Sequence, residues 1–147
     1  MTFRFESESV LRWSDVDRAG VLNNAVYLTL LEEARFAYFG ELGLLEGDDF
    51  PFLLGETCVR FLRPGRAGMR VVIRARTLRI GTKSLEMAYE IEHGGEPLAS
   101  AVATLVWVGR AGTSCAVPAA ARAAIATFED LSDEPAGAPG RSLPASP

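Results

Sequence analysis

The chain has 147 residues, a length that fits a single domain with its own buried core. Hydrophobic residues make up 48% of it and charged residues 23%, which is typical of a globular protein, and the formal net charge of −4 argues against general nucleic-acid binding. The sequence has no apolar run of membrane-spanning length, no signal-peptide pattern and only two cysteines, Cys58 and Cys115. We therefore expect a cytoplasmic protein with free thiols and with neither nucleic-acid nor membrane partners.

The first half of the chain predicts a strand followed by a helix. Residues 3–13 show an imperfect alternation of apolar and polar side chains, which predicts the strand. Residues 24–42 change to a helical pattern that is apolar around most of its circumference, which predicts a helix buried on most sides and ended by Gly43. The polar loop 47–51 that follows is predicted to be mobile.

Four further runs have the alternation and the turn spacing of an antiparallel meander. They are residues 57–62, 69–80, 83–93 and 98–108. Residues 118–129 predict a short Ala-rich helix, and the Pro-, Ala-, Gly- and Ser-rich residues 131–147 predict a disordered tail. The chain is thus expected to form one α+β domain over residues 1–130, with a curved antiparallel sheet wrapped around one central α-helix.

Positive charge is concentrated between residues 57 and 83, a segment with eight cationic side chains and no Asp or Glu. One interpretation is the solvated outer face of a pair of strands. Taken together in an acidic protein, these side chains also suggest an anionic partner such as a nucleotide phosphate. They are Arg60, Arg63, Arg66, Arg70, Arg74, Arg76, Arg79 and Lys83.

The segment 13–27 carries the groups that point most directly to chemistry. It contains two carboxylates, Asp15 and Asp17, then a glycine turn, then a helix start at Asn23 or Asn24. A helix that begins at an Asn cap directs free backbone N–H groups into the space before it. These groups and the helix dipole favour the negative charge that develops on a carbonyl oxygen under attack. Together with a carboxylate just upstream, they are the minimum equipment for hydrolysing an ester or thioester.

Three segments of the chain occur in the order and spacing of one known family. They are R-W-S-D-V-D-R-A-G-V-L-N-N-A-V-Y-L-T-L-L-E-E-A-R over residues 12–35, R-F-L-R-P-G-R-A-G over 60–68, and G-T-K-S over 81–84 followed by Y-E-I over 89–91. In these segments the chain resembles the 4-hydroxybenzoyl-CoA thioesterase family of hotdog-fold acyl-CoA thioesterases, over roughly residues 5 to 110. The resemblance implies the hotdog fold and hydrolysis of an acyl-CoA to the free acid and CoA, with no cofactor.

The resemblance also implies roles for particular residues. The family's catalytic carboxylate is the second Asp of the D-x-D pair, which here is Asp17, acting as nucleophile through a mixed anhydride or as general base on water. The backbone N–H that polarises the thioester carbonyl maps to Asn24. The Lys-Ser step that commonly lies along the CoA path maps to Lys83 and Ser84. Many relatives read G-H-V-N-N where this chain reads G-V-L-N-N, so no histidine is available there; His93, in a predicted hairpin turn, is expected to be exposed.

Each of these assignments has an alternative. Asp17 could instead cap the turn before the helix, as we expect of Asp15. A D-x-D pair can ligate a divalent cation, but no further ligands cluster nearby, and we expect no metal. Glu33 is a reserve catalytic carboxylate, because other hotdog enzymes use a helix glutamate; a buried ion pair or a subunit contact is the alternative for it. Tyr27 is a candidate acyl contact or a core residue.

The expected partners are an acyl-CoA and further copies of the chain. Family members dimerise by extending the sheet and often pair again, so the resemblance implies a homodimer or homotetramer with sites between subunits. In such a site Asp17 would lie beside Arg60, Arg63 or Lys83, from the same or the neighbouring chain. Two other functions remain open: a thioesterase acting on acyl carrier protein, and a binding module without catalysis. A hydratase is less favoured because the Asp–His pair is missing.

Overall fold

The computed structural model describes residues 1–45 and 51–131, so most of the predicted mobile loop and nearly all of the predicted tail lie outside the described residues. The elements in chain order are β1 (Phe5–Val10), the 3-10 helix η1 (Trp13–Asp15), α1 (Asn24–Glu41), β2 (Phe52–Phe61), β3 (Arg70–Ile80), β4 (Ser84–His93), β5 (Glu96–Trp107) and α2 (Ala119–Glu129). Both cysteines are free, as predicted. Among the helices that the structure describes, none has the length and apolarity needed to cross a membrane.

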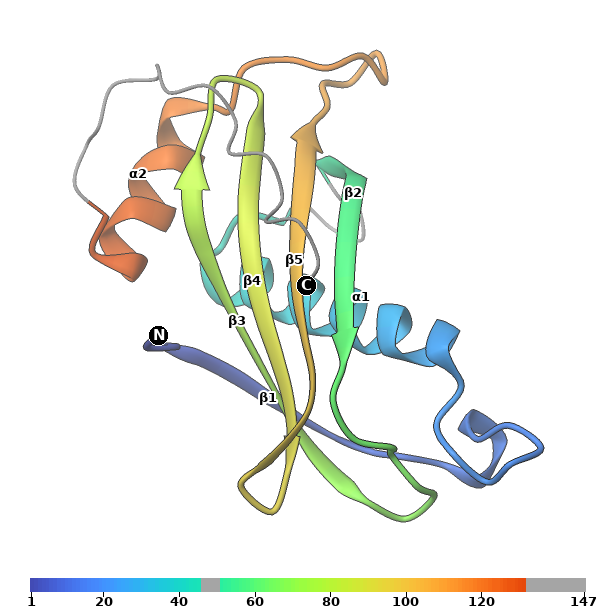
Figure 1. Ribbon diagram of the computed structural model, residues 1–147. Coiled ribbons are helices and arrows are strands. Elements are labelled where there is room, and N and C mark those ends of the chain that lie inside the picture. The colour runs from blue at the N-terminus through green and yellow to red at the C-terminus, as the bar shows by residue number, and fades with distance from the viewer. Residues whose placement is uncertain (46–50, 132–147) are drawn as a thin grey trace, which may run out of the picture.

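The strands form one antiparallel sheet in the order β1-β3-β4-β5-β2. Helix α1 lies across one face of this sheet, and α2 lies beside the end of β3 (Figure 1). This arrangement confirms the predicted α+β fold with a central helix. It leaves β1 and β2 as the two edges of the sheet.

The alternation of side chains along the meander gives the sheet one buried and one outer face. Ile73 pairs with Ile91 and Ala75 with Tyr89, and all four are buried against α1. The outer-face positions between them carry ionic side chains. The period-two pattern of the sequence therefore determines which face of the sheet packs against α1.

Helix α1 is buried on one side only. Its inward residues include Leu31, Tyr38 and Phe39, which are buried, whereas Leu28 is 42% exposed and Phe36 38% exposed. The prediction of a helix buried on most sides is therefore wrong for a single chain. The apolar outer side of α1 is open to contact with another molecule.

Strand β2 begins at Phe52, not at residue 57 as the alternation predicts. The strand register shifts between Leu54 and Glu56, so Gly55 is an extra residue in a bulge. A bulge inverts the alternation, and the strand pattern is therefore interrupted at the glycine. Leu53 is 61% exposed on this edge strand.

Helix α2 is anchored by a buried carboxylate. Glu129 Oε1 accepts hydrogen bonds from the Thr77 backbone N–H at 2.8 Å and from the Tyr38 hydroxyl at 2.8 Å. The Tyr38 and Thr77 hydroxyls are 2.9 Å apart. Strand β1 begins opposite Ala75, so Glu129 supplies an acceptor to β3 just beyond the end of its neighbouring strand.

Candidate active site

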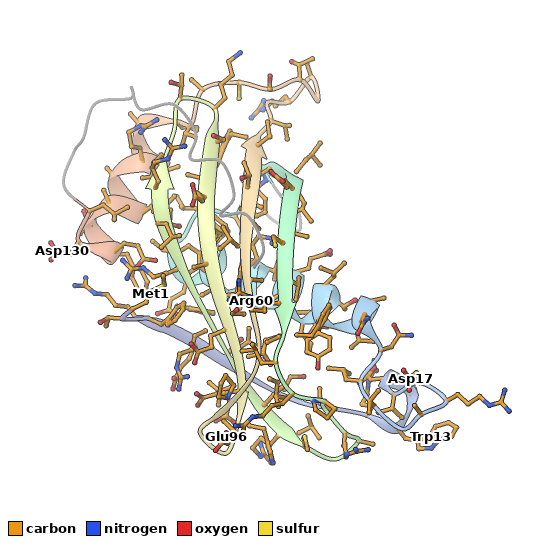
Figure 2. The ribbon with its side chains drawn as sticks, viewed as in Figure 1. Met1, Trp13, Asp17, Arg60, Glu96 and Asp130 are labelled. Carbon is orange, nitrogen blue, oxygen red and sulfur yellow. The ribbon has the colours of Figure 1, made fainter. Side chains whose placement is uncertain are left out.

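Asp17 lies in a small hairpin, here called the Asp17 hairpin, formed by residues 15–23. An antiparallel bridge joins Val16 to Leu22, and the Asp17 N–H donates to the Val21 carbonyl at 2.8 Å. Gly20 has a φ of 75° at the tip, a backbone conformation that glycine adopts without strain. Asp17 is exposed and lies with Trp13 at one end of the molecule (Figure 2).

The two carboxylate oxygens of Asp17 have different surroundings. Oδ1 accepts hydrogen bonds from the backbone N–H of Ala19 at 2.8 Å and of Val21 at 3.4 Å. Oδ2 has no hydrogen-bond partner among the residues that the structure describes. One oxygen thus holds the side chain to the turn and the other remains available, so turn capping and chemistry are compatible in this residue.

The start of α1 provides the second group of the site. Asn23 is the N-cap, and its side-chain oxygen accepts from the Ala25 N–H at 3.0 Å. The N–H of Asn24, the first helical residue, has no partner in the described part of the chain. It is exposed at the positive end of the helix dipole. Asp17 lies two residues along the hairpin from the Asp15–Asn23 pair, a separation of about 7 Å along the strand.

Asp15 has a structural role, as predicted. Its side chain is buried, and its carboxylate accepts from the Arg12 backbone N–H at 2.8 Å and from the Arg12 guanidinium at 3.0 and 3.2 Å. The hydrogen bonds from Arg12 lower the pKa of the Asp15 carboxyl. Its backbone carbonyl accepts from the Asn23 N–H at 2.9 Å, which ties the hairpin to the helix start.

The Asp17 hairpin rests on the loop between β2 and β3. The Leu22 N–H donates to the Gly65 carbonyl at 2.8 Å. A Cβ atom at Gly65 would lie 2.9 Å from Leu11 Cδ1 and 3.0 Å from Leu22 Cβ, so a larger residue would require these leucines to move. The Tyr27 hydroxyl donates to the Arg63 carbonyl at 3.4 Å, and the ring contacts Phe61 edge-on.

Tyr27 is buried, and burial raises the pKa of its hydroxyl. The structure thus places Tyr27 at the contact of α1 with the β2–β3 loop. Arg63 forms an ion pair with Glu96 of the β4–β5 turn. Arg60 is exposed on the outer face of β2 opposite Ser100, and it has no ion-pair partner among the described residues.

Lys83 and Ser84 lie far from Asp17 in the same chain. Lys83 lies in the β3–β4 turn and Ser84 is the first residue of β4, whereas the Asp17 hairpin is next to the first residues of β3, at the opposite end of the sheet (Figure 1). Strand β3 has 11 residues and therefore separates the two places by about 30 Å. The exposed Lys83 accepts at its carbonyl from the Trp107 N–H at 2.8 Å, and Ser84 is half-buried.

Most of the cationic segment lies on the outer face of the sheet among glutamates. Arg74 contacts Glu6, Glu90 and Glu92, the closest approach being 2.6 Å to Glu92. The other ion pairs are Arg63–Glu96, Arg70–Glu8 and Arg79–Glu86. Four of the eight cations are thus neutralised, as expected of a solvated outer face, and this segment is not a continuous patch for anions.

Two further predictions concern acidic and imidazole side chains. Glu33 is exposed on α1. The prediction that it forms a buried ion pair is therefore wrong for a single chain. The pKa of Arg12 is raised mainly by its hydrogen bond to Asp15 and by the charge of Asp15, and to a minor extent by the charge of Glu33. His93 is the last residue of β4 and is half-buried, with Nδ1 2.7 Å from the Arg70 carbonyl.

Among the described residues, no three His, Cys, Asp or Glu side chains gather to hold a metal ion.

The structure also shows a cavity that the sequence analysis did not predict. It measures about 220 Å³ and lies between α1 and the start of β2. Its lining residues are Glu32, Arg35, Phe52, Leu53 and Leu54. Arg35 is only 5% exposed. Its helical spacing of four residues from both Leu31 and Phe39 was the available signal that it faces inward.

Comparisons with known proteins define the class. Residues 11–125 match the thioesterase-like superfamily, and the chain belongs to this superfamily. This confirms the resemblance drawn from the three sequence segments, and the fold is the hotdog fold of these thioesterases.

Three relatives illustrate the similarity. A crystal structure of a thioesterase complexed with coenzyme A and Zn from Thermus thermophilus is 30% identical, with a TM-score of 0.80 over 88% of this chain and 97% of that chain. The 1,4-dihydroxy-2-naphthoyl-CoA thioesterase Slr0204 from Synechocystis is 23% identical, with a TM-score of 0.75 over 89% of this chain and 98% of that chain, which supports the fold alone. The chloroplastic acyl-acyl carrier protein thioesterase ATL2 of Arabidopsis thaliana is 25% identical over 84% of this chain and 69% of its own length.

Proposed function

We propose that this thioesterase-like hotdog protein hydrolyses acyl-CoA thioesters, with Asp17 as the catalytic carboxylate and the Asn24 N–H as the donor to the thioester oxygen. The observation that carries the proposal is that one short segment, the Asp17 hairpin with the start of α1, contains two available groups. The Asp17 hairpin presents one carboxylate oxygen without a partner, and the adjacent start of α1 presents a backbone N–H without a partner in the described residues. The similarity to a thioesterase crystallised with coenzyme A supports CoA as the thiol.

Two mechanisms use the same groups. As a general base, Asp17 takes a proton from a water molecule whose oxygen attacks the thioester carbonyl carbon; the C–S bond then breaks and the CoA thiolate leaves. As a nucleophile, Asp17 Oδ2 attacks the carbonyl carbon, expels the CoA thiolate and forms a mixed anhydride that water hydrolyses. In both, the Asn24 N–H would stabilise the negative charge on the carbonyl oxygen, and one such donor contributes about 10²–10³-fold.

The proposed site requires a second chain if Lys83 and Ser84 bind CoA next to Asp17, because one chain separates them by the length of β3. We infer a homodimer built on edge strand β2, in which the neighbouring chain supplies these residues and Arg60. The exposed apolar side chains of Leu53 on β2 and Leu28 on α1 support contact on this side of the molecule. Pairing of two such dimers would give a tetramer.

Release of free thiol from short, medium, long and aromatic acyl-CoAs tests the proposal. Wild type should turn over at least one of these substrates, and Asp17→Asn should lose about 10²–10⁴-fold in kcat while keeping the fold. Arg18→Gln, at the neighbouring exposed position, is the matched control and should keep its activity. Unchanged turnover in Asp17→Asn would move the chemistry elsewhere, first to Glu33.

A second candidate substrate is an acyl group on acyl carrier protein. The similarity to the plant acyl-acyl carrier protein thioesterase favours it. Comparing the same acyl group on CoA and on carrier protein distinguishes the two, because a carrier-specific enzyme would show a much higher kcat/KM for the protein-bound thioester. Stabilisation by acyl-CoA with no hydrolysis of either substrate would indicate a binding module.

A further inference from the structure

Arg35 of α1 is a buried cation whose hydrogen-bonding capacity is mostly unused. A guanidinium carries five N–H donors. Here Nη1 donates to the Tyr89 hydroxyl at 3.0 Å, and the guanidinium carbon lies 5.7 Å from the centre of the Tyr89 ring. Within residues 1–45 and 51–131, no carboxylate forms an ion pair with it and no second acceptor is within hydrogen-bond distance. Its other nitrogens are not among the fully buried polar atoms that lack a partner in the described residues, so they remain accessible and can take a further acceptor.

Arg35 is one of the residues that line the cavity described above. Arg35 forms part of its wall, while Phe52, Leu53 and Leu54 form an apolar wall from β2. The cavity is half-open to solvent, and its volume of about 220 Å³ is larger than the roughly 150 Å³ at which an enclosed apolar cavity holds benzene. One aromatic ring or a short alkyl chain with a small polar end therefore fits.

We propose that the Arg35 cavity, defined by its five lining residues, binds a small carboxylic acid with an apolar body. The carboxylate would accept hydrogen bonds from the guanidinium of Arg35, whose planar fork matches two carboxylate oxygens. The ring or alkyl chain would lie against Phe52 and Leu54. A single carboxylate neutralises the single buried charge, whereas a phosphate brings more charge and more bound water into an apolar space.

Glu32 is the internal competitor for Arg35, because it lines the same cavity three residues earlier on the helix. Its side chain is exposed and forms no ion pair with Arg35. A ligand carboxylate would therefore meet an unoccupied guanidinium. The binding does not require thioester hydrolysis, although a carboxylic acid is also its product class, and the apolar wall of the cavity lies on the strand on which we infer the homodimer.

Titration of the full chain with benzoate, followed by calorimetry or by NMR, tests the proposal, with benzamide as the uncharged analogue of the same shape. Benzoate should bind saturably, and benzamide at least about tenfold more weakly, because the charge-assisted hydrogen bonds are lost. Leu54→Trp, a change at a half-exposed lining position, should fill the cavity and abolish benzoate binding. Leu62→Trp is the matched control at an exposed leucine that does not line the cavity, and it should bind like wild type.

Three results would overturn the proposal. They are no saturable binding of benzoate by wild type, equal affinity for benzoate and benzamide, and benzoate binding that persists in Leu54→Trp. Arg35→Lys provides a second variant, since it keeps the charge but not the planar fork, and it should weaken benzoate binding by about tenfold. Unchanged affinity in a folded Arg35→Lys protein would exclude the fork as the recognition element. Thiol release by the same variants reports separately on hydrolysis.

Discussion

At the scale of single residues, the Asp17 hairpin shows how neighbouring carboxylates take different roles. Asp15 is buried and receives three hydrogen bonds from Arg12, so both of its carboxylate oxygens already have protein partners. Asp17, two residues later, is exposed and keeps one oxygen without a protein partner in the described chain. Hydrogen bonding, rather than residue type, thus separates the scaffold carboxylate from the candidate for chemistry.

The lowered pKa of Asp15 predicts a specific pH dependence of stability. A carboxyl whose folded-state pKa lies below its unfolded value of about 4 stabilises the fold above that pH, and the contribution is lost as the pH falls through the folded pKa. Asp15→Asn should therefore be less stable than wild type at neutral pH, with a difference that shrinks below about pH 4. Urea unfolding at neutral pH and at about pH 3 measures this.

Arg12→Gln is the control for this prediction, because it removes the guanidinium and leaves both the carboxyl and the hydrogen bond from the backbone N–H of residue 12. It should reproduce part of the loss of pH-dependent stability. A difference between wild type and Asp15→Asn that grows on acidification would contradict the assignment of Arg12 as the cause.

The local hydrogen bonds of the hairpin could be predicted from the sequence, whereas the catalytic role of Asp17 stays a prediction. The Asn cap, the glycine turn and the D-x-D pair lie within a few positions of each other, and their hydrogen bonds follow from that spacing. Arg35 was different. Its partner Tyr89 is on β4 and its cavity is completed by β2, so its burial depends on contacts between distant elements.

At the scale of elements, α2 is held to the sheet by Glu129. The Thr77 N–H and the Tyr38 hydroxyl both donate to this carboxylate. Glu129→Leu should cost about 1–3 kcal/mol of unfolding free energy, because it leaves the buried Thr77 N–H without an acceptor. Glu129→Gln keeps an acceptor oxygen and should cost less.

Denaturant unfolding of these two variants beside Tyr38→Phe measures the effect. Tyr38→Phe is the control that removes one donor and leaves the bond from Thr77 to Glu129 in place. Equal losses in the Leu and Gln variants would show that the Thr77 N–H does not depend on this acceptor.

Element positions were predictable where the pattern was regular and failed where the backbone departed from it. Strand β3 keeps its alternation up to a register shift between Thr77 and Arg79, and the sequence predicted the bounds of β3 and β4 within about a residue. Strand β2 contains the Gly55 bulge, so its first half lost the alternation and was missed. Helix α2 was found from its composition, but Glu129 was not, because its acceptor role requires Thr77 at the uncovered end of β3.

At the scale of the whole molecule, the exposed apolar side of α1 and β2 predicts self-association. Leu53 is 61% exposed on the edge strand, so Leu53→Lys should leave the isolated chain folded and oppose the pairing of two β2 edges. Light scattering coupled to size exclusion should find a dimer or tetramer for wild type and a shift towards monomer for the variant.

Val10→Lys is the matched control for self-association. It places the same charge at an exposed apolar position on β1, the other edge of the sheet. We expect its assembly to match wild type. Loss of assembly in Val10→Lys with no effect of Leu53→Lys would place the interface at β1 instead.

The length of β3 predicts that two inactive variants complement each other in a mixed dimer. Because Asp17 and Lys83 lie at opposite ends of this strand, the proposed shared site would take them from different subunits. Two defective copies, one carrying Asp17→Asn and the other Lys83→Glu, would then rescue each other when they assemble together, since every mixed pair contains one site with neither change. Refolding the two variants as a mixture should restore thiol release that neither shows alone, and an inactive mixture would mean that each subunit works by itself.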